Sequence, residues 1–340
     1  MMKAAIFDRA ERIVRVTEMP IPEPAPDEVL IRVCRCGICG TDVSLTGNSG
    51  ASYQQGRFGH EYAGEVIEAG RDVTTHKPGD RVAVIPVVGC GHCENCRWGN
   101  PLLCGSRRSA QQGLGEYAAV PARVAVHLPQ TLSFADGAMI EPMACGLHAM
   151  RLAGVDSDSR VLVIGGGSMA LSAIYWARRS GARRIVVLSR SAHRADLLQQ
   201  VGADAVLGFD PDNDARLKEM LGGAPHIVAE CVGKPGMVNL ALDHVAPRGT
   251  VISMGMCRHA EAIVPSRVAY KEAKLIFPIA YSAEEFAETA RVFDAEGFHA
   301  EQIVSEVIGL EALPARMAEM RAGRSSFKIQ VDPARSAQGE

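Results

Sequence analysis

Four cysteines lie close together in one short segment of this 340-residue chain. They follow the spacing C-x2-C-x2-C-x7-C, and they are Cys90, Cys93, Cys96 and Cys104. Four thiolates at such spacings can close tetrahedrally around one Zn2+ and leave no open coordination position. Glycines and polar residues between them indicate a loop rather than a packed core. We therefore predict a structural zinc lobe at about residues 89–105.

A second set of possible metal ligands is dispersed along the chain. It comprises Cys39 in GICGTD, His60 and Glu61 in FGHEYAG, and Glu141 in EPMACGLH. Each is weak evidence alone, because a buried cysteine or a Glu-Pro pair is common. Together they offer a thiolate, an imidazole and carboxylates, which suit a catalytic zinc with an exchangeable position for substrate. Two zinc ions per chain are thus expected.

A glycine-rich loop follows the apolar run VLVI at 161–164. Its residues are Gly165, Gly166, Gly167, Ser168 and Met169, and Ala170 replaces the third glycine of the usual fingerprint. A predicted strand precedes the loop and a predicted helix follows it, as in dinucleotide-binding folds. Glycines let the backbone approach a pyrophosphate, whose charge the helix N-terminus meets. The loop predicts a nicotinamide dinucleotide site.

The residue after the second strand of this region bears on the choice of cofactor. NAD-binding folds place a carboxylate there to bind the adenosine ribose, whereas this chain has Ser189. Arg190 follows at once and Arg194 comes one helical turn later. Two guanidiniums could converge on the 2′-phosphate of NADP. We expect NADP(H) to be preferred over NAD(H).

The pattern of elements divides the chain into two parts. Short strand-like runs separated by Gly and Pro occupy residues 1 to about 145, which is typical of a β-barrel-like domain. From residue 160, strand-like runs at 161–164, 184–188, 204–207, 226–230 and 250–254 alternate with helical stretches. This alternation predicts a parallel sheet with helices on both faces. Two further helices, near 283–297 and 311–323, precede a closing run at 327–331.

Several motifs together resemble the zinc-containing medium-chain alcohol and polyol dehydrogenases. They are GICGTD (37–42), GHEYAGEVIEAGRDV (59–73), the four-cysteine segment, EPMACGLHAM (141–150) and the glycine-rich loop, in the family's order. The resemblance covers nearly the whole chain. It implies an α/β two-domain fold: a GroES-like β-barrel catalytic domain (1–147 and 283–340) and a Rossmann domain with a doubly wound parallel sheet (148–282).

The resemblance also implies metal ligands. Cys39 and His60 would bind the catalytic zinc, and in the sorbitol and threonine dehydrogenase branches the third ligand would be Glu141. Glu61 would lie beside the metal and exchange with water as a ligand. Asp42 would orient the imidazole of His60.

A proton relay is implied in the same way. Thr41 resembles the family's relay hydroxyl, which passes the substrate's proton away from the zinc. Many relatives have a histidine five residues after the cysteine ligand, but this chain has Ser44, so the end of the relay stays open. The family places a histidine near the active site at His148.

Composition excludes several classes of partner. The net charge of −3 provides no basic face for nucleic acid, and no run approaches the about 18 apolar residues of a membrane span. Charged residues within the first sixteen positions argue against a signal peptide. We expect a cytoplasmic protein that acts on a small alcohol or carbonyl compound and, by the family's habit, forms a homodimer or homotetramer.

Two alternatives remain at this stage. A zinc-free quinone reductase of the same fold should lack both ligand sets, and a non-catalytic regulator would bind zinc and nucleotide without turnover. The sequence does not predict which alcohol or carbonyl compound is the substrate. The segment between Gly47 and Phe58 is expected to border its pocket, but it predicts no side-chain preference.

Overall fold

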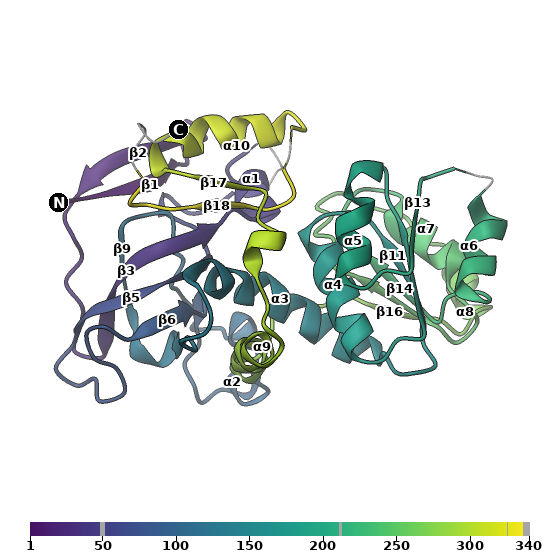
Figure 1. Ribbon diagram of the computed structural model, residues 1–340, viewed down its shortest axis with the longest axis horizontal. Coiled ribbons are helices and arrows are strands. Elements are labelled where there is room, and N and C mark those ends of the chain that lie inside the picture. Colours follow the sequence, from purple (N-terminus) through teal and green to yellow (C-terminus); the bar gives the residue numbers. More distant parts are fainter. Residues whose placement is uncertain (48–51, 211–212, 325, 336–340) are drawn as a thin grey trace. The chain divides into compact units, whose positions relative to one another are not determined.

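The computed structural model describes residues 1–47, 52–210, 213–324 and 326–335. These residues form two compact units (Figure 1), one of residues 1–141 with 281–340 and one of residues 142–280. The sequence predicted domain boundaries at 147/148 and 282/283, and these lie within six residues of the unit boundaries at 141/142 and 280/281. The predicted boundaries stay predictions. The long helix α3 (Phe134–Ala153) runs from the first unit into the second.

The first unit consists mainly of antiparallel strands. A three-stranded sheet has the order β2-β1-β4, a larger sheet has the order β10-β6-β5-β3-β18-β17, and β9 also pairs with β3. Hydrogen bonds among the described strands do not close into a single ring. The strands are β1 (Met2–Asp8), β2 (Ile13–Met19), β3 (Glu28–Gly37), β4 (Gly56–Arg57), β5 (Glu61–Ala69), β6 (Arg81–Val84), β7 (Val87–Val88), β8 (Arg108–Ser109), β9 (Tyr117–Pro121), β10 (Ala125–His127), β17 (Glu306–Ile308) and β18 (Ile329–Val331).

The end of the chain completes this sheet. Strand β18 pairs antiparallel with β3, so Val331 lies opposite Cys36. Four helices accompany the strands: α1 (Gly40–Leu45), α2 (Glu94–Arg97), α9 (Ala283–Glu296) and α10 (Leu313–Arg321). Helix α9 begins with a capping box, in which the Ser282 hydroxyl accepts from the Glu285 amide and the Glu285 carboxylate accepts from the Ser282 amide.

The second unit is a parallel sheet of order β13-β12-β11-β14-β15-β16. Its strands are β11 (Arg160–Ile164), β12 (Arg184–Leu188), β13 (Ala205–Leu207), β14 (Ile227–Glu230), β15 (Thr250–Ser253) and β16 (Lys274–Ile276). The helices are α4 (Ser168–Arg179), α5 (Ala195–Val201), α6 (Asn213–Leu221), α7 (Met237–His244) and α8 (Pro265–Ala269). Figure 1 shows α4 and α5 on one face and α6 to α8 on the other.

Burial explains the sequence of these central strands. In β11 the four residues after Arg160 are all 0% exposed. Helices cover both faces of the sheet, so every side chain of the strand is buried and the strand is apolar throughout. The predicted strand and helix alternation is therefore confirmed. The strand order reverses between β11 and β14, which creates the crevice where such sheets bind nucleotides.

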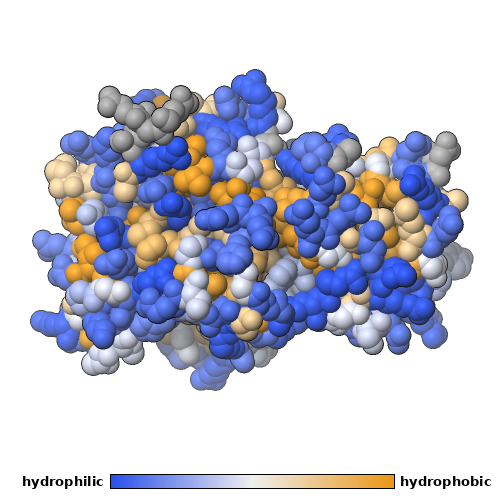
Figure 2. All heavy atoms as spheres, in the orientation of Figure 1, coloured by the Kyte–Doolittle hydropathy of each residue, from blue (hydrophilic) through white to orange (hydrophobic). Residues whose placement is uncertain are grey.

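One face of the molecule is largely polar. Figure 2 shows hydrophilic residues over most of the visible face, with hydrophobic residues in smaller groups. Among the described residues, no helix is long and apolar enough to cross a membrane.

Candidate functional site: two metal clusters and a nucleotide loop

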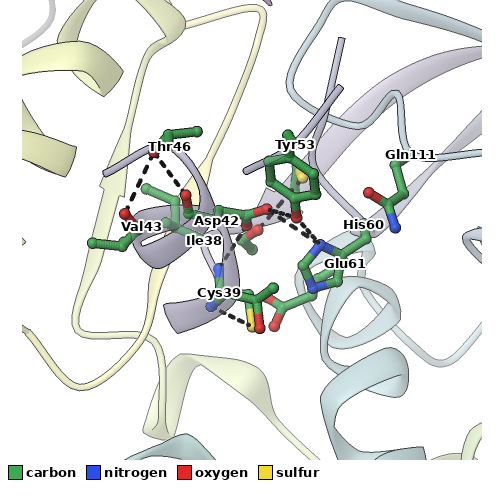
Figure 3. Close-up of polar contacts among 12 residues, drawn as sticks. Ile38, Cys39, Asp42, Val43, Thr46, Tyr53, His60, Glu61 and Gln111 are labelled. Carbon is green, nitrogen blue, oxygen red and sulfur yellow. Dashed lines mark hydrogen bonds and ion pairs between the residues drawn. The ribbon is translucent and has the colours of Figure 1, made fainter. Parts of the chain in front are cut away.

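Strand pairing brings the dispersed ligands together. Gly37, at the end of β3, lies opposite Glu61, the first residue of β5. Cys39 caps the N-terminus of α1, two residues after β3, and His60 directly precedes β5. The ligand atoms of Cys39, His60 and Glu61 lie within 4.8 Å of one another. Figure 3 shows these three side chains converging on one point.

Asp42 orients the imidazole from behind. Its side chain is 0% exposed, and Oδ1 lies 3.2 Å from Nδ1 of His60. Oδ2 accepts a hydrogen bond from the Cys39 amide at 2.9 Å, so one carboxylate steadies both residues. Burial opposes a charged imidazole, but Asp42 and Cys39 together outweigh it and raise the pKa of His60 in the metal-free chain.

Tyr53 is a member of this network that the sequence did not reveal. Its hydroxyl donates to Oδ1 of Asp42 at 2.8 Å and lies 3.4 Å from Nδ1 of His60 (Figure 3). Burial and the neighbouring carboxylate raise the pKa of Tyr53, so it stays a neutral donor. The preceding residues 48–51 of the expected pocket border lie outside the described part of the chain.

Glu61 is also held by a residue from the far end of the chain. The ammonium of Lys328 pairs with Oε2 of Glu61, and the two side chains are 1% and 2% exposed. A Cβ on Gly37 would lie only 2.1 Å from that carboxylate oxygen, so glycine makes room for the pair. Burial lowers the pKa of Lys328, but the charges of Glu61, Cys39 and Glu141 and the hydrogen bond to Glu61 together raise it above its usual value, so the ammonium persists.

Glu141 lies near the cluster but outside its tightest group. Burial raises the pKa of this carboxyl to about 7, and the charges of His60 and Glu61 also act on it. Its Oε1 accepts a hydrogen bond from the Tyr281 hydroxyl at 3.1 Å. The third residue that lies with Cys39 and His60 is thus Glu61. That Glu141 is the third zinc ligand stays a prediction.

The other expected residues are placed as follows. Thr41 and Ser44 lie on α1, in the helix that Cys39 caps, and both are partly buried. His148 lies on α3 in the part that belongs to the second unit.

The four cysteines form the second cluster. The thiol sulfurs of Cys90, Cys93, Cys96 and Cys104 lie within 4.8 Å of one another. In the metal-free chain, backbone amides of His92 and Cys93 lower the pKa of Cys90 to about 6, whereas burial and the neighbouring thiols raise the pKa of Cys93 to about 11. Gly89 leaves room for this packing, since a Cβ there would lie 2.5 Å from the sulfur of Cys96. Four convergent thiols with no oxygen ligand fit a closed zinc site.

The nucleotide loop joins β11 to α4 in the second unit. Gly165 has φ +121°, which L side chains rarely adopt, and a Cβ on Gly166 would lie 2.4 Å from Oγ of Ser189. Ser168 is the first residue of the helix and Met169 follows it. Nη1 of Arg194 donates to the Gly166 carbonyl at 2.9 Å, so this arginine reaches the loop. Arg190 is exposed.

Comparison with known families agrees with both units. Residues 25–130 match the alcohol dehydrogenase GroES-like domain, and residues 168–295 match the zinc-binding dehydrogenase domain. The chain therefore belongs to the zinc-containing medium-chain alcohol and polyol dehydrogenases, and the predicted family and two-domain fold class are confirmed. It is an oxidoreductase that acts on alcohols or polyols.

Individual relatives are similar to this chain over most of its length. Sorbitol dehydrogenase of Gallus gallus is 34% identical over 273 residues, which cover 74% of this chain and 75% of the relative. A zinc-binding dehydrogenase structure from Sinorhizobium meliloti 1021, bound to NADP, is 29% identical and covers 98% of this chain and 99% of that chain, with a TM-score of 0.88. The 2R,3R-butanediol dehydrogenase of Bacillus subtilis is 26% identical with a TM-score of 0.87, covering 98% of this chain and 100% of that chain.

Proposed function

We propose that this protein transfers a hydride between a secondary alcohol or polyol and NADP(H) at a zinc site formed by Cys39, His60 and a carboxylate. The observation that carries the proposal is the convergence of a thiol, an imidazole and a carboxyl group within 4.8 Å. Zinc prefers this mixture of donors, and a site with three protein ligands keeps a position for substrate. The resting third ligand is proposed to be Glu141, with Glu61 exchanging. The four-cysteine lobe would hold a second, structural zinc.

The chain's own residues then perform defined tasks. A zinc ion in this site supplies Lewis acidity, which lowers the pKa of the substrate's hydroxyl. Asp42 holds the imidazole of His60 in one orientation, and Tyr53 fixes Asp42 in turn. Thr41 would accept the proton from the substrate oxygen. Ser44 stands where many relatives have histidine, so we propose that water, the cofactor ribose or another residue completes the relay. His148, which the family's pattern places near the active site, is one candidate for that residue.

The preference for NADP(H) is supported by the end of β12. Ser189 supplies a hydroxyl where a carboxylate would repel the 2′-phosphate. Arg194 already contacts the glycine loop through Gly166, and exposed Arg190 lies beside Ser189. The Sinorhizobium meliloti relative is bound to NADP. The relatives also support the substrate class, since sorbitol is a polyol and 2R,3R-butanediol carries secondary hydroxyls.

We further propose that the protein is a cytoplasmic homodimer or homotetramer. Strand β16 lies at one end of the strand order of its sheet, and Tyr270 and Phe277, just before and after it in sequence, are 92% and 63% exposed. An open edge flanked by exposed aromatic side chains favours association. The described structure joins no two of the ten cysteines in a disulfide, which suits a reducing compartment. Light scattering at several protein concentrations would determine the number of subunits.

A substrate screen tests the main proposal. Reduced-cofactor absorbance would be followed with secondary alcohols, polyols and aromatic alcohols, each with NADP and NAD, and with a chelator as control. We expect turnover of at least one secondary alcohol or polyol that the chelator abolishes. Chelator-resistant activity on quinones would indicate the zinc-free alternative. Tight cofactor binding without turnover of any alcohol or carbonyl compound would indicate a regulator.

A further inference from the structure

Glu230 is a fully buried carboxylate that takes no part in the chemistry described above. It is the last residue of β14, and its side chain is 0% exposed. In the sheet register it lies level with Ile164, the last residue of β11, and with Ser253, the last residue of β15. It therefore lies at the carboxyl edge of the sheet, beside the point where the strand order reverses.

The two oxygens of this carboxylate are held by different segments of the chain. Oε1 accepts hydrogen bonds from the amides of Val232 at 2.6 Å and Gly233 at 2.8 Å, in the loop after β14. Oε2 accepts from the hydroxyl of Ser253 at 2.9 Å, at the end of β15. Burying a carboxylate costs several kcal/mol unless such donors compensate it.

The loops that Glu230 joins are packed against one another and against the nucleotide loop. A Cβ on Gly255 would lie 2.1 Å from the nitrogen of Gly233 and 2.8 Å from Oε2 of Glu230, so the two loops touch. A Cβ on Gly165 would lie 3.2 Å from Val232. A displacement of the loop after β14 would therefore reach both of its neighbours.

We propose that Glu230 is a positioning residue that fixes the half of the cofactor site that receives the nicotinamide. Doubly wound folds bind a dinucleotide across two mononucleotide halves. Here the first half, β11 to β13, carries the glycine loop, Ser189 and Arg194, and the second half begins with β14. Glu230 ties together the two loops of that second half. The inference rests on the proposed NADP(H) function.

A comparison of two ligands separates positioning from general stability. NADPH occupies both halves of the site, whereas adenosine 2′,5′-bisphosphate lacks the nicotinamide and its ribose and occupies the first half alone. We expect Glu230→Ala to weaken NADPH binding about tenfold or more while fragment affinity changes less than about twofold. Glu230→Gln should restore NADPH binding to within about threefold, because its carbonyl still accepts from two amides and its amide donates to Ser253.

The matched control is Asp204, which accepts hydrogen bonds from the Ile185 amide at 2.7 Å and from Arg178 at 2.8 Å near the amino ends of β12 and β13. Asp204→Ala should lower the melting temperature yet leave both affinities unchanged. If Glu230→Ala does not fold, Glu230→Asp is the second variant. Its shorter side chain keeps the charge but moves it away from the three donors, so we expect it to lose affinity for NADPH and not for the fragment.

Two kinds of result would overturn the proposal. Equal losses for NADPH and the fragment, or no loss for either, would show that Glu230 has no role particular to the nicotinamide half. If the unaltered protein binds NADH instead, the same comparison uses NADH and AMP. If it binds no dinucleotide at all, the proposed function and this inference both fail, which differs from equal losses in a protein that binds normally.

Discussion

Lys328 forms a buried ion pair with Glu61, a member of the candidate catalytic metal cluster, although 267 positions separate the two residues in the chain. Both side chains are at most 2% exposed. Removing one partner of such a pair leaves an uncompensated charge, whereas replacing both leaves none. The pair thus links the C-terminal strand β18 to the metal site.

We expect Lys328→Met to lower the free energy of unfolding by about 3 kcal/mol, because Glu61 then stays buried without its cation. The double variant Lys328→Met with Glu61→Gln should recover much of this loss. Urea unfolding of the four proteins in the cycle would measure the coupling. The exposed pair Arg248–Glu272, whose side chains are 82% and 67% exposed, is the control, and Arg248→Met should cost less than about 1 kcal/mol. Additive losses in the cycle would contradict the predicted coupling.

The catalytic cluster and the nucleotide loop belong to different units, so they should be separable by mutation. Cys39→Ser and His60→Ala are expected to abolish turnover, because each removes a zinc ligand, while cofactor binding measured by fluorescence persists. Glu141→Ala should lose metal affinity or rate. Normal turnover of the Glu141 variant would identify Glu61 or water as the better third ligand.

The four-cysteine lobe should affect assembly and stability more than chemistry. Cys104 is 1% exposed and is the buried member of the four, and its sulfur accepts from the Cys90 amide at 3.4 Å. Cys104→Ser should reduce the zinc content from two ions per chain to one and lower the melting temperature. Cys257→Ser, outside both clusters, should keep both ions. Retention of zinc and of the melting temperature in the Cys104 variant would contradict a structural site.

The sequence predicted the parts of the site whose residues are close together along the chain. The cysteine spacing and the glycine-rich loop are local patterns, and so are the central strands, whose apolar runs reflect burial on both faces. Lys328, Tyr281 and Tyr53 were missed because nothing near them in sequence indicates their partners. Glu230 reads as the polar end of a strand, and only the folded loops around it show that it is buried. Such pairings arise from tertiary structure alone.

Glu141 should make the zinc-free protein sensitive to pH. Burial raises the pKa of its carboxyl from 4.5 to about 7, so the folded state favours the protonated form. Its contribution to stability is fully present below pH 4.5 and is lost as the pH rises through about 7. From about pH 5 to about pH 8 the loss should be on the order of 2 kcal/mol. Urea unfolding after chelation should show this loss, and Glu141→Gln should remove it. An unchanged slope in that variant would contradict the assignment.

The cofactor preference should reverse when the end of β12 is altered. Ser189→Asp combined with Arg190→Ala places a carboxylate where it repels the 2′-phosphate and removes one of the two guanidiniums proposed to bind it. Each lost charged contact should cost on the order of 1.5 to 3 kcal/mol, or roughly ten- to a hundredfold in affinity. Arg194 remains, held by its hydrogen bond to the Gly166 carbonyl, so the loop should keep its shape. The measurement is kcat/KM for NADP and NAD in the native protein and in the double variant. Arg183 is an exposed arginine directly before the opposite end of the same strand, and Arg183→Ala is the control, which should leave the ratio of the two kcat/KM values unchanged. Equal or better use of NAD by the native protein, or a double variant whose preference does not move toward NAD, would show that this strand end does not select the cofactor.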